Sequence, residues 1–260
     1  MIRCDGRLEL TALPGLPLLG PGDDLPALIA LALERAAIEL CDGDVIVVAS
    51  KAVSRVEGRF VDLASVAVSS RAQTIAIETG KDPRLVELIL GEAQAISRTG
   101  PNALVVRHKR GFVTGDAGID CSNAEPRGTP GGEWALLLPE APDASAERIR
   151  EALAKRTGAA IGVVISDSFG RPFRIGTVGA AIGVAGLPAL WDRRGELDLQ
   201  GRPLQRTITA LADQIAAAAD LVAGQAAEGR AAIHVRGLTF PVGAHTAAEL
   251  HRPPEQDLYA

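Results

Sequence analysis

Aromatic residues are scarce in this chain of 260 residues, where phenylalanine, tyrosine and tryptophan together make up 3%. Because hydrophobic residues reach 47%, an ordinary share for a globular protein, the core must be built mainly from Ala, Val, Leu and Ile. No apolar run is long enough to cross a bilayer, and charges interrupt the first ten residues. We therefore expect neither a membrane span nor a secretory leader, and one domain over residues 1–260.

Cysteine and excess positive charge are also lacking. Cys4, Cys41 and Cys121 are odd in number and widely spaced, so neither a CxxC zinc site nor a disulfide framework is indicated. This usage favours a reducing compartment, and we expect a cytoplasmic protein. The net charge of −5 argues against a nucleic-acid partner, because binding to a phosphate backbone needs a basic face.

The common catalytic motifs are absent as well. The chain has no P-loop of the form GxxxxGK[ST], no GxGxxG after a strand and no GxSxG elbow of a serine hydrolase. Its four histidines show no HxH or HxxxH spacing, which makes a histidine-based metal centre unlikely to form. If a nucleotide binds, it must bind in a less common cradle.

Two aspartates give the strongest indication of a functional site in this sequence. Asp120 follows an apolar position in a glycine-rich segment, and Asp167 follows the apolar run 161–166, which predicts a buried strand. Ser168, Arg171 and Arg174 come next along the chain. Ligands in α/β architectures gather at strand ends, and oxygen donors beside arginines suggest a divalent metal that carries phosphate groups. A solvated turn at either aspartate is the structural alternative.

The hydrophobic spacing predicts both helices and strands. A helix should begin after Asp24, with others over residues 70–79, 82–97, 145–156 and 206–223. Short apolar runs predict strands over residues 44–49, 103–107, 134–138 and up to 165, and a last one over 231–235. Since these elements alternate without a regular βαβ order, the expected fold class is α+β, or irregular mixed α/β.

Several motifs together resemble the family of coenzyme F420-0:L-glutamate ligases, over residues 15–238. The matching segments are Gly15-Leu16-Pro17-Leu18, the turn 42–44 leading to Ser50-Lys51, Glu57-Gly58-Arg59, the segment 117–123, the segment 167–174 and residues 235–238. The resemblance implies an enzyme that adds one or more L-glutamates to the deazaflavin coenzyme F420-0, with GTP as cosubstrate. It also implies Mn²⁺ or Mg²⁺, K⁺, and two closely packed lobes in an intertwined homodimer.

The resemblance assigns site residues by position. Asp120 and Asp167 match ligands of one metal, while Ser168 and Gln225 match ligands of a second. Gln225 stands where a glutamate can occur and Arg55 where lysine is common. The positions that match GTP contacts are Leu16, Pro17, Leu18, Leu19, Ser50, Lys51, Arg55, Asn123, Ala223, Gly224, Gln225, Ala226, Ala227, Glu228, Gly229 and Arg230.

Some expectations rest on the residues rather than on the resemblance. The spacing of Arg171 and Arg174 beside Asp167 predicts that they stabilise charge on a transferring phosphoryl group or hold an acidic substrate. Bacterial members of this family can carry a C-terminal FMN-binding domain, which we do not expect in this chain. Two rival functions stay open: a metal-dependent phosphatase or other phosphoryl-transfer enzyme, and a non-catalytic protein that binds GTP or F420.

Overall fold

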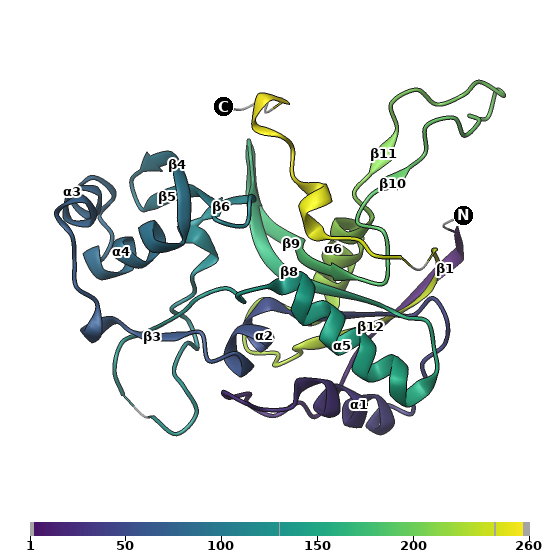
Figure 1. The fold of residues 1–260 in the computed structure, drawn as a ribbon, viewed down its shortest axis with the longest axis horizontal. Helices are drawn as coiled ribbons and strands as arrows, with labels where there is room; N and C mark the ends of the chain where they lie inside the picture. The colour runs from purple at the N-terminus through teal and green to yellow at the C-terminus, as the bar shows by residue number, and fades with distance from the viewer. Residues whose placement is uncertain (1–2, 130, 242, 257–260) are drawn as a thin grey trace.

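A five-stranded sheet forms the centre of the computed structural model, which describes residues 3–129, 131–241 and 243–256 (Figure 1). Its strand order is β1-β12-β2-β8-β9, and only β2 and β8 run parallel. Because β2 and the first four residues of β8 (162–165) are buried on both faces, they read as continuous apolar runs in the sequence. The strand bounds are Arg3–Ala12 for β1, Val45–Ala49 for β2, Gly162–Arg171 for β8, Arg174–Ala185 for β9 and Ala232–Thr239 for β12.

Helices cover both faces of this sheet. One face packs against α1 (Leu25–Arg35), α5 (Pro142–Thr157) and α2 (Ser50–Val56), with Ile29, Leu153 and Ile165 among its fully buried side chains. The other face packs against α6 (Leu211–Ala223). Small residues dominate α6 and let it lie close to the strands, so aliphatic side chains fill both layers with few aromatics, as the composition predicts.

A second, smaller core lies beside the main sheet. The helices α3 (Ser70–Thr79) and α4 (Pro83–Glu92) pack on an antiparallel sheet of β4 (Ala93–Gly100), β5 (Ala103–His108) and β6 (Val113–Gly115). Figure 1 shows this unit to one side of the main sheet. The chain enters the unit after β3 (Phe60–Asp62) and leaves it before β7 (Trp134–Leu136), and these two strands pair with each other. The fold is therefore of the expected mixed α+β class.

The short elements complete the description. A hairpin of β10 (Trp191–Asp192) and β11 (Ile208–Thr209) extends away from the sheet and exposes Leu197 and Leu199 (Figure 1). No helix within the described part of the chain is both long and apolar enough to cross a membrane. The 3₁₀ turns are Leu63–Ser65, Asp116–Gly118, Ala247–Leu250 and Pro254–Gln256.

The helix starts show where local sequence decides the structure. As predicted, α1 begins after Asp24, whose carboxylate accepts a hydrogen bond from the Ala27 amide, and Pro26 lies in the first turn. Four predicted bounds are wrong. The chain leaves α4 at Glu92 and continues as β4, α5 begins at Pro142 rather than Ser145, and α6 begins at Leu211 rather than residue 206. The strand β8 continues past residue 165 to Arg171.

A buried ion pair connects two neighbouring strands of the sheet. Asp44, which is 1% exposed just before β2, accepts hydrogen bonds from Arg236 Nε at 2.9 Å and Nη2 at 2.7 Å. His234 Nε2, also on β12, lies 2.9 Å from the same carboxylate. Burial favours the neutral acid, but these partners outweigh it and lower the pKa of Asp44 to about 2. The pair therefore stabilises the alignment of β2 with β12.

Candidate functional site

The topology brings distant segments to one end of the main sheet. The strand β2 ends there, while β8 continues past it to Arg171; β12, which is antiparallel to β2, begins there, and β1 ends beside it. The loops 13–20, 120–127 and 224–231 therefore meet the start of α2. Two backbone hydrogen bonds join them, from the Ala49 amide to the Ala231 carbonyl and from the Leu13 amide to the Ala232 carbonyl, both at 2.9 Å.

The register of the parallel strands places Ser50 beside Asp167. Ala49 is the register partner of Ser166, so the next residue of each chain segment lies at the same level. The Ser50 hydroxyl donates to Asp167 Oδ1 over 2.9 Å. Ser50 is also the first residue of α2, which has no side-chain cap. The strand end predicted at residue 49 therefore lies beside Asp167, but the end predicted at residue 165 is wrong, because β8 continues through Asp167 to Arg171.

Lys51 connects this pair to the second aspartate. Its ammonium lies 2.5 Å from Asp120 Oδ2 and donates to the Ser122 carbonyl over 3.2 Å. Asp120 Oδ1 accepts from the Ser122 amide over 2.6 Å, so the turn expected as the structural alternative also exists. A β-bridge to Leu136 holds the backbone of Asp120. Asp120 thus stabilises its loop and presents a carboxylate to the site.

The two aspartates have opposite electrostatic environments. Burial raises the pKa of Asp167 to about 6, and the negative charge of Asp120 contributes in the same direction. Burial would also raise the pKa of Asp120, but hydrogen bonds from Lys51 and Ser122 outweigh it and lower that pKa. The site therefore holds one stabilised carboxylate and one whose negative charge lacks compensation. Such perturbed pairs are typical of functional sites.

Ser168 and Gln225 lie on another part of the same strand end. Residues alternate between the two faces of β8, so Asp167 shares a face with Ile165 while Ser168 shares the α6 face with Val164. Gln225 follows α6, and its amide nitrogen donates to Asp220 Oδ1. The structure thus places Asp167 and Ser168, assigned to different metals, on opposite faces of β8, and among the described residues Gln225 bonds to Asp220 rather than to Ser168.

Arg55 joins two of the loops that the resemblance assigns to GTP. It is 5% exposed, and its guanidinium donates to the carbonyls of Leu19, Asn123 and Glu125 over 2.8, 2.8 and 3.1 Å. The guanidinium also lies 5.1 Å from the centre of the Phe60 ring. All three of its nitrogens are therefore engaged with the protein. Sequence reasoning noted the charge of Arg55 but had no indication of these carbonyl partners.

Arg171 and Arg174 occupy the tip of the β8–β9 hairpin. Beyond Ser166 the hairpin has no strand on the β2 side, and Arg171 is the register partner of Arg174. Arg171 is half-buried and shares the face of Asp167, whereas Arg174 is exposed. The structure therefore keeps Arg171 on the side of the aspartates, four residues further along the strand.

The donor set agrees with a metal that shares its coordination with phosphate. Among the described residues, no group of three or more His, Cys, Asp and Glu side chains lies close enough to hold a metal alone. Mg²⁺, however, is commonly held by one or two carboxylates together with substrate phosphates and water. Asp120 and Asp167 supply two carboxylates, and the raised pKa of Asp167 reflects a negative charge that a cation would stabilise.

Sequence reasoning missed a strained turn next to Asp120. Asp116, Ala117 and Gly118 have φ values of 52°, 55° and 68°, so three consecutive residues adopt left-handed backbone geometry. Lys81 lies 2.8 Å from Asp116 Oδ2, while the buried Oδ1 has no hydrogen-bond partner among the described residues. Such strain concentrates at functional sites. The only indication in the sequence is the pair of glycines that flanks residues 116–117.

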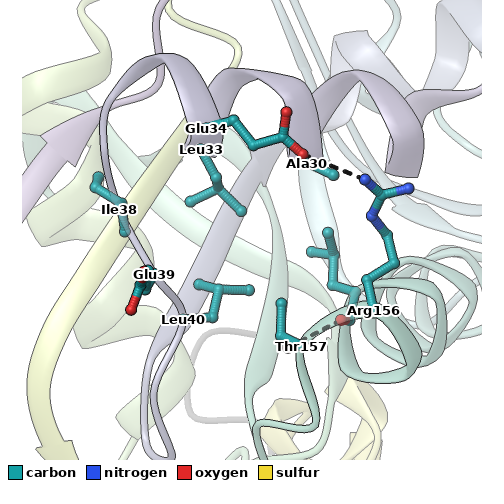
Figure 2. Close-up of a pocket in the computed structure, with 9 residues that line it drawn as sticks. Ala30, Leu33, Glu34, Ile38, Glu39, Leu40, Arg156 and Thr157 are labelled. Carbon is teal, nitrogen blue, oxygen red and sulfur yellow. Dashed lines mark hydrogen bonds and ion pairs between the residues drawn. The ribbon is translucent and has the colours of Figure 1, made fainter.

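A cavity of about 500 Å³ lies elsewhere. Figure 2 shows it between α1 and the end of α5, with Glu34 and Arg156 paired over 3.4 Å at its rim. Its lining includes Leu40, just before β2, and Thr157, just before β8. It therefore lies at the opposite end of the parallel strands from Ser50 and Asp167. None of the predicted site residues lines this cavity.

Comparisons with known proteins agree with the motifs. A family model described as F420-0:Gamma-glutamyl ligase matches residues 15–237. The chain is 46% identical to the coenzyme F420:L-glutamate ligase of Methanothermobacter thermautotrophicus, over 97% of this chain and 98% of that protein. Proteins of the same name from Methanopyrus kandleri and Methanocaldococcus jannaschii are 45% and 41% identical, over 92% and 100% of this chain and 92% and 99% of their own lengths.

Proposed function

Because the chain belongs to the F420-0:gamma-glutamyl ligase family, a family of ligase enzymes, we propose that it is a GTP-dependent ligase that joins L-glutamate to coenzyme F420-0. The observation that carries the proposal is the meeting of Ser50, Lys51, Asp120 and Asp167 where the parallel pairing of β2 with β8 ends. This is the end of a parallel pair where ligands collect. The site combines oxygen donors for a cation with an ammonium group for phosphate.

The proposed reaction needs an activated carboxylate, because an amine does not displace oxide from a carboxylate directly. The terminal carboxylate of F420-0 attacks the γ-phosphorus of GTP, which forms an acyl phosphate and releases GDP. The α-amine of glutamate then attacks the acyl carbon, forms the C–N bond, expels phosphate and loses a proton. Atoms and charge balance as one amide, GDP and inorganic phosphate, and repetition adds further glutamates.

The residues of the site take distinct parts in this proposal. Lys51 neutralises phosphate oxygens, and Ser50 keeps Asp167 oriented through its hydrogen bond. Leu16, Pro17, Leu18, Leu19, Asn123 and the loop from Ala223 to Arg230 form the nucleotide pocket. Arg55 holds two walls of that pocket, while Arg171 and Arg174 supply positive charge for the acidic reactants.

Metal ions belong to the proposal as well. Asp120 and Asp167 would hold Mn²⁺ or Mg²⁺, and Ser168 with Gln225 would contribute to a second ion, with K⁺ as the monovalent cation. A divalent ion supplies charge neutralisation on the transferring phosphoryl group when bound. The role of the chain itself is to bring the two carboxylates to one site, where burial favours the neutral form of Asp167 and a cation would offset its charge, with Lys51 beside Asp120.

A homodimer completes the proposal. The β10–β11 hairpin leaves the main sheet with Leu199 fully exposed and Leu197 at 68%, which is a large apolar area for a surface loop. A second copy of the chain would cover it, as an intertwined dimer requires.

The decisive experiment is mass spectrometry of F420-0 incubated with the protein, GTP, Mn²⁺ and L-glutamate. We expect a gain of one or more glutamyl residues that depends on GTP, with one GDP released per addition. Phosphate release without a glutamyl product would support a phosphatase instead. Binding of GTP or F420-0 without any turnover would support a non-catalytic binding protein.

A further inference from the structure

We propose that Arg171 binds the phosphodiester of the acceptor substrate and so distinguishes the phosphorylated acceptor from its unphosphorylated precursors. This inference rests on the proposed function and adds a subsite to it. The phosphodiester links the lactyl carboxylate of F420-0 to the rest of the deazaflavin, so it must lie near the reacting carboxylate but apart from GTP.

The first observation is an unsatisfied donor. The Nε–H group of Arg171 is buried and has no acceptor among the described residues. A buried donor without a partner costs about 1–3 kcal/mol, and native structures contain few of them. A ligand oxygen would remove this cost. The contrast with Arg55 is clear, because each nitrogen of the Arg55 guanidinium already has a carbonyl partner.

The second observation is uncompensated charge. Arg171 and Arg174 are paired across β8 and β9, where like charges destabilise the strands. Neither arginine forms an ion pair with a carboxylate in the described part of the chain, although acidic residues exceed basic ones by 32 to 27 overall. Two arginines at paired strand positions without an acid are stabilised by an added anion, and the planar fork of arginine suits phosphate.

The third observation is position. Asp167, Phe169 and Arg171 alternate onto one face of β8, so all three look toward the same side of the sheet. The distance along an extended strand from Asp167 to Arg171 is about 13 Å, which separates the arginine from phosphates held at Asp167. A reactant that begins at Asp167 and runs along this face passes Phe169 and reaches Arg171. The acceptor has such an anionic group, since its phosphodiester lies between the reacting carboxylate and the ring.

An apolar wall accompanies this path. The ring of Phe169 lies 5.2 Å from the ring of Phe112, centre to centre, and Phe112 stacks on His108 at 4.8 Å. Phe112 also lines a cavity of about 390 Å³ with Ile182 and His251. Phe112 and His108 are buried, so Phe169 is the partly exposed ring of this cluster, and it offers an apolar contact on the path from Asp167 for an acceptor that has an acidic arm and a planar ring.

The test compares Arg171→Met and Arg171→Lys with the control Arg98→Met, an exposed arginine on β4 of the smaller sheet. Because a hydrogen bond to a charged group contributes about 1.5–3 kcal/mol, Arg171→Met should raise the KM for F420-0 by roughly 10- to 150-fold. The KM values for GTP and glutamate should stay within about twofold. Arg171→Lys should give a smaller increase, and Arg98→Met none.

Three outcomes would overturn the assignment. One is an unchanged KM for F420-0 in Arg171→Met, another is a rise in the KM for glutamate instead, and the third is a loss of kcat with all KM values unchanged. Equal melting temperatures of the variants control for folding. Fluorescence titration of F420-0 without GTP measures acceptor binding directly, so it decides on Arg171 even if the wild-type protein makes no glutamyl product and the proposed ligase function itself fails.

Discussion

The removal of the Arg55 guanidinium should destabilise the protein before any substrate is added. Arg55→Met deprives three backbone carbonyls of their donor, at Leu19, Asn123 and Glu125. At about 1 kcal/mol for each hydrogen bond, the free energy of unfolding should fall by about 3 kcal/mol. For a chain of this size the melting temperature should fall by roughly 6–12 °C. Arg55→Lys keeps one hydrogen-bond donor group at this position, so its free energy of unfolding should fall less than that of Arg55→Met.

Differential scanning fluorimetry in the absence of GTP measures this effect. Arg127→Met is the matched control, because Arg127, like Arg55, donates to a backbone carbonyl of the loop 13–20, at Leu18. Unlike Arg55, Arg127 is 50% exposed and pairs with the carboxylate of Asp23. Exposed ion pairs contribute about 0–1 kcal/mol, so this variant should melt within about 3 °C of the wild-type protein. If Arg55→Met melts no lower than Arg127→Met, Arg55 does not hold the loops together.

Three further perturbations follow from the structure. The folded pKa of Asp44, about 2, lies below the ordinary value of 3.8, so its ionised form stabilises the folded protein above pH 4, and this stabilisation is lost as pH falls toward 2. In urea titrations, the free energy of unfolding should fall by about 2 kcal/mol over this pH range in the wild-type protein, and this pH-dependent fall should be absent in Asp44→Asn. Asp167→Asn should lower metal-dependent turnover at least about 100-fold, while its melting temperature is unchanged or higher because burial disfavours the charged form; intact turnover would refute its metal assignment. Replacement of both Leu197 and Leu199 by serine should raise the dimer dissociation constant by more than about 100-fold in sedimentation equilibrium, and a wild-type monomer would contradict the proposed dimer.

The sequence predicts the elements whose local signals agree with their tertiary environment. The capping aspartate and early proline of α1 define its start, and the apolar runs of β2 and β8 can only be buried strands. Residues 93–97 have helical composition, yet they pair with β5 as part of β4, because a strand partner nearby outweighs weak propensity. β1 escaped prediction since alternating charges, typical of an edge strand, mask its extended backbone.

The candidate site also contains features that the sequence predicts and features that it does not. The sequence identifies Asp120, Asp167 and Lys51 as candidate site residues, because each is a charged residue that follows an apolar segment. The contacts that hold the loops together could not be predicted, since Arg55 donates to backbone carbonyls, which every residue has. The left-handed turn at Asp116 was also hidden, because aspartate and alanine give no warning of a positive φ. Side-chain chemistry is therefore easier to predict than backbone recognition.

The parallel register of β2 and β8 makes the site depend on residue count. Because Ser50 meets Asp167 through the pairing of Ala49 with Ser166, one residue inserted in β8 would turn Asp167 toward α6 and present its neighbour to Ser50. Neither apolar content nor strand propensity would change noticeably. Active homologues should therefore have no insertions or deletions in this strand, even where substitutions are frequent. Selection should act more strictly on the number of residues in β8 than on their identity.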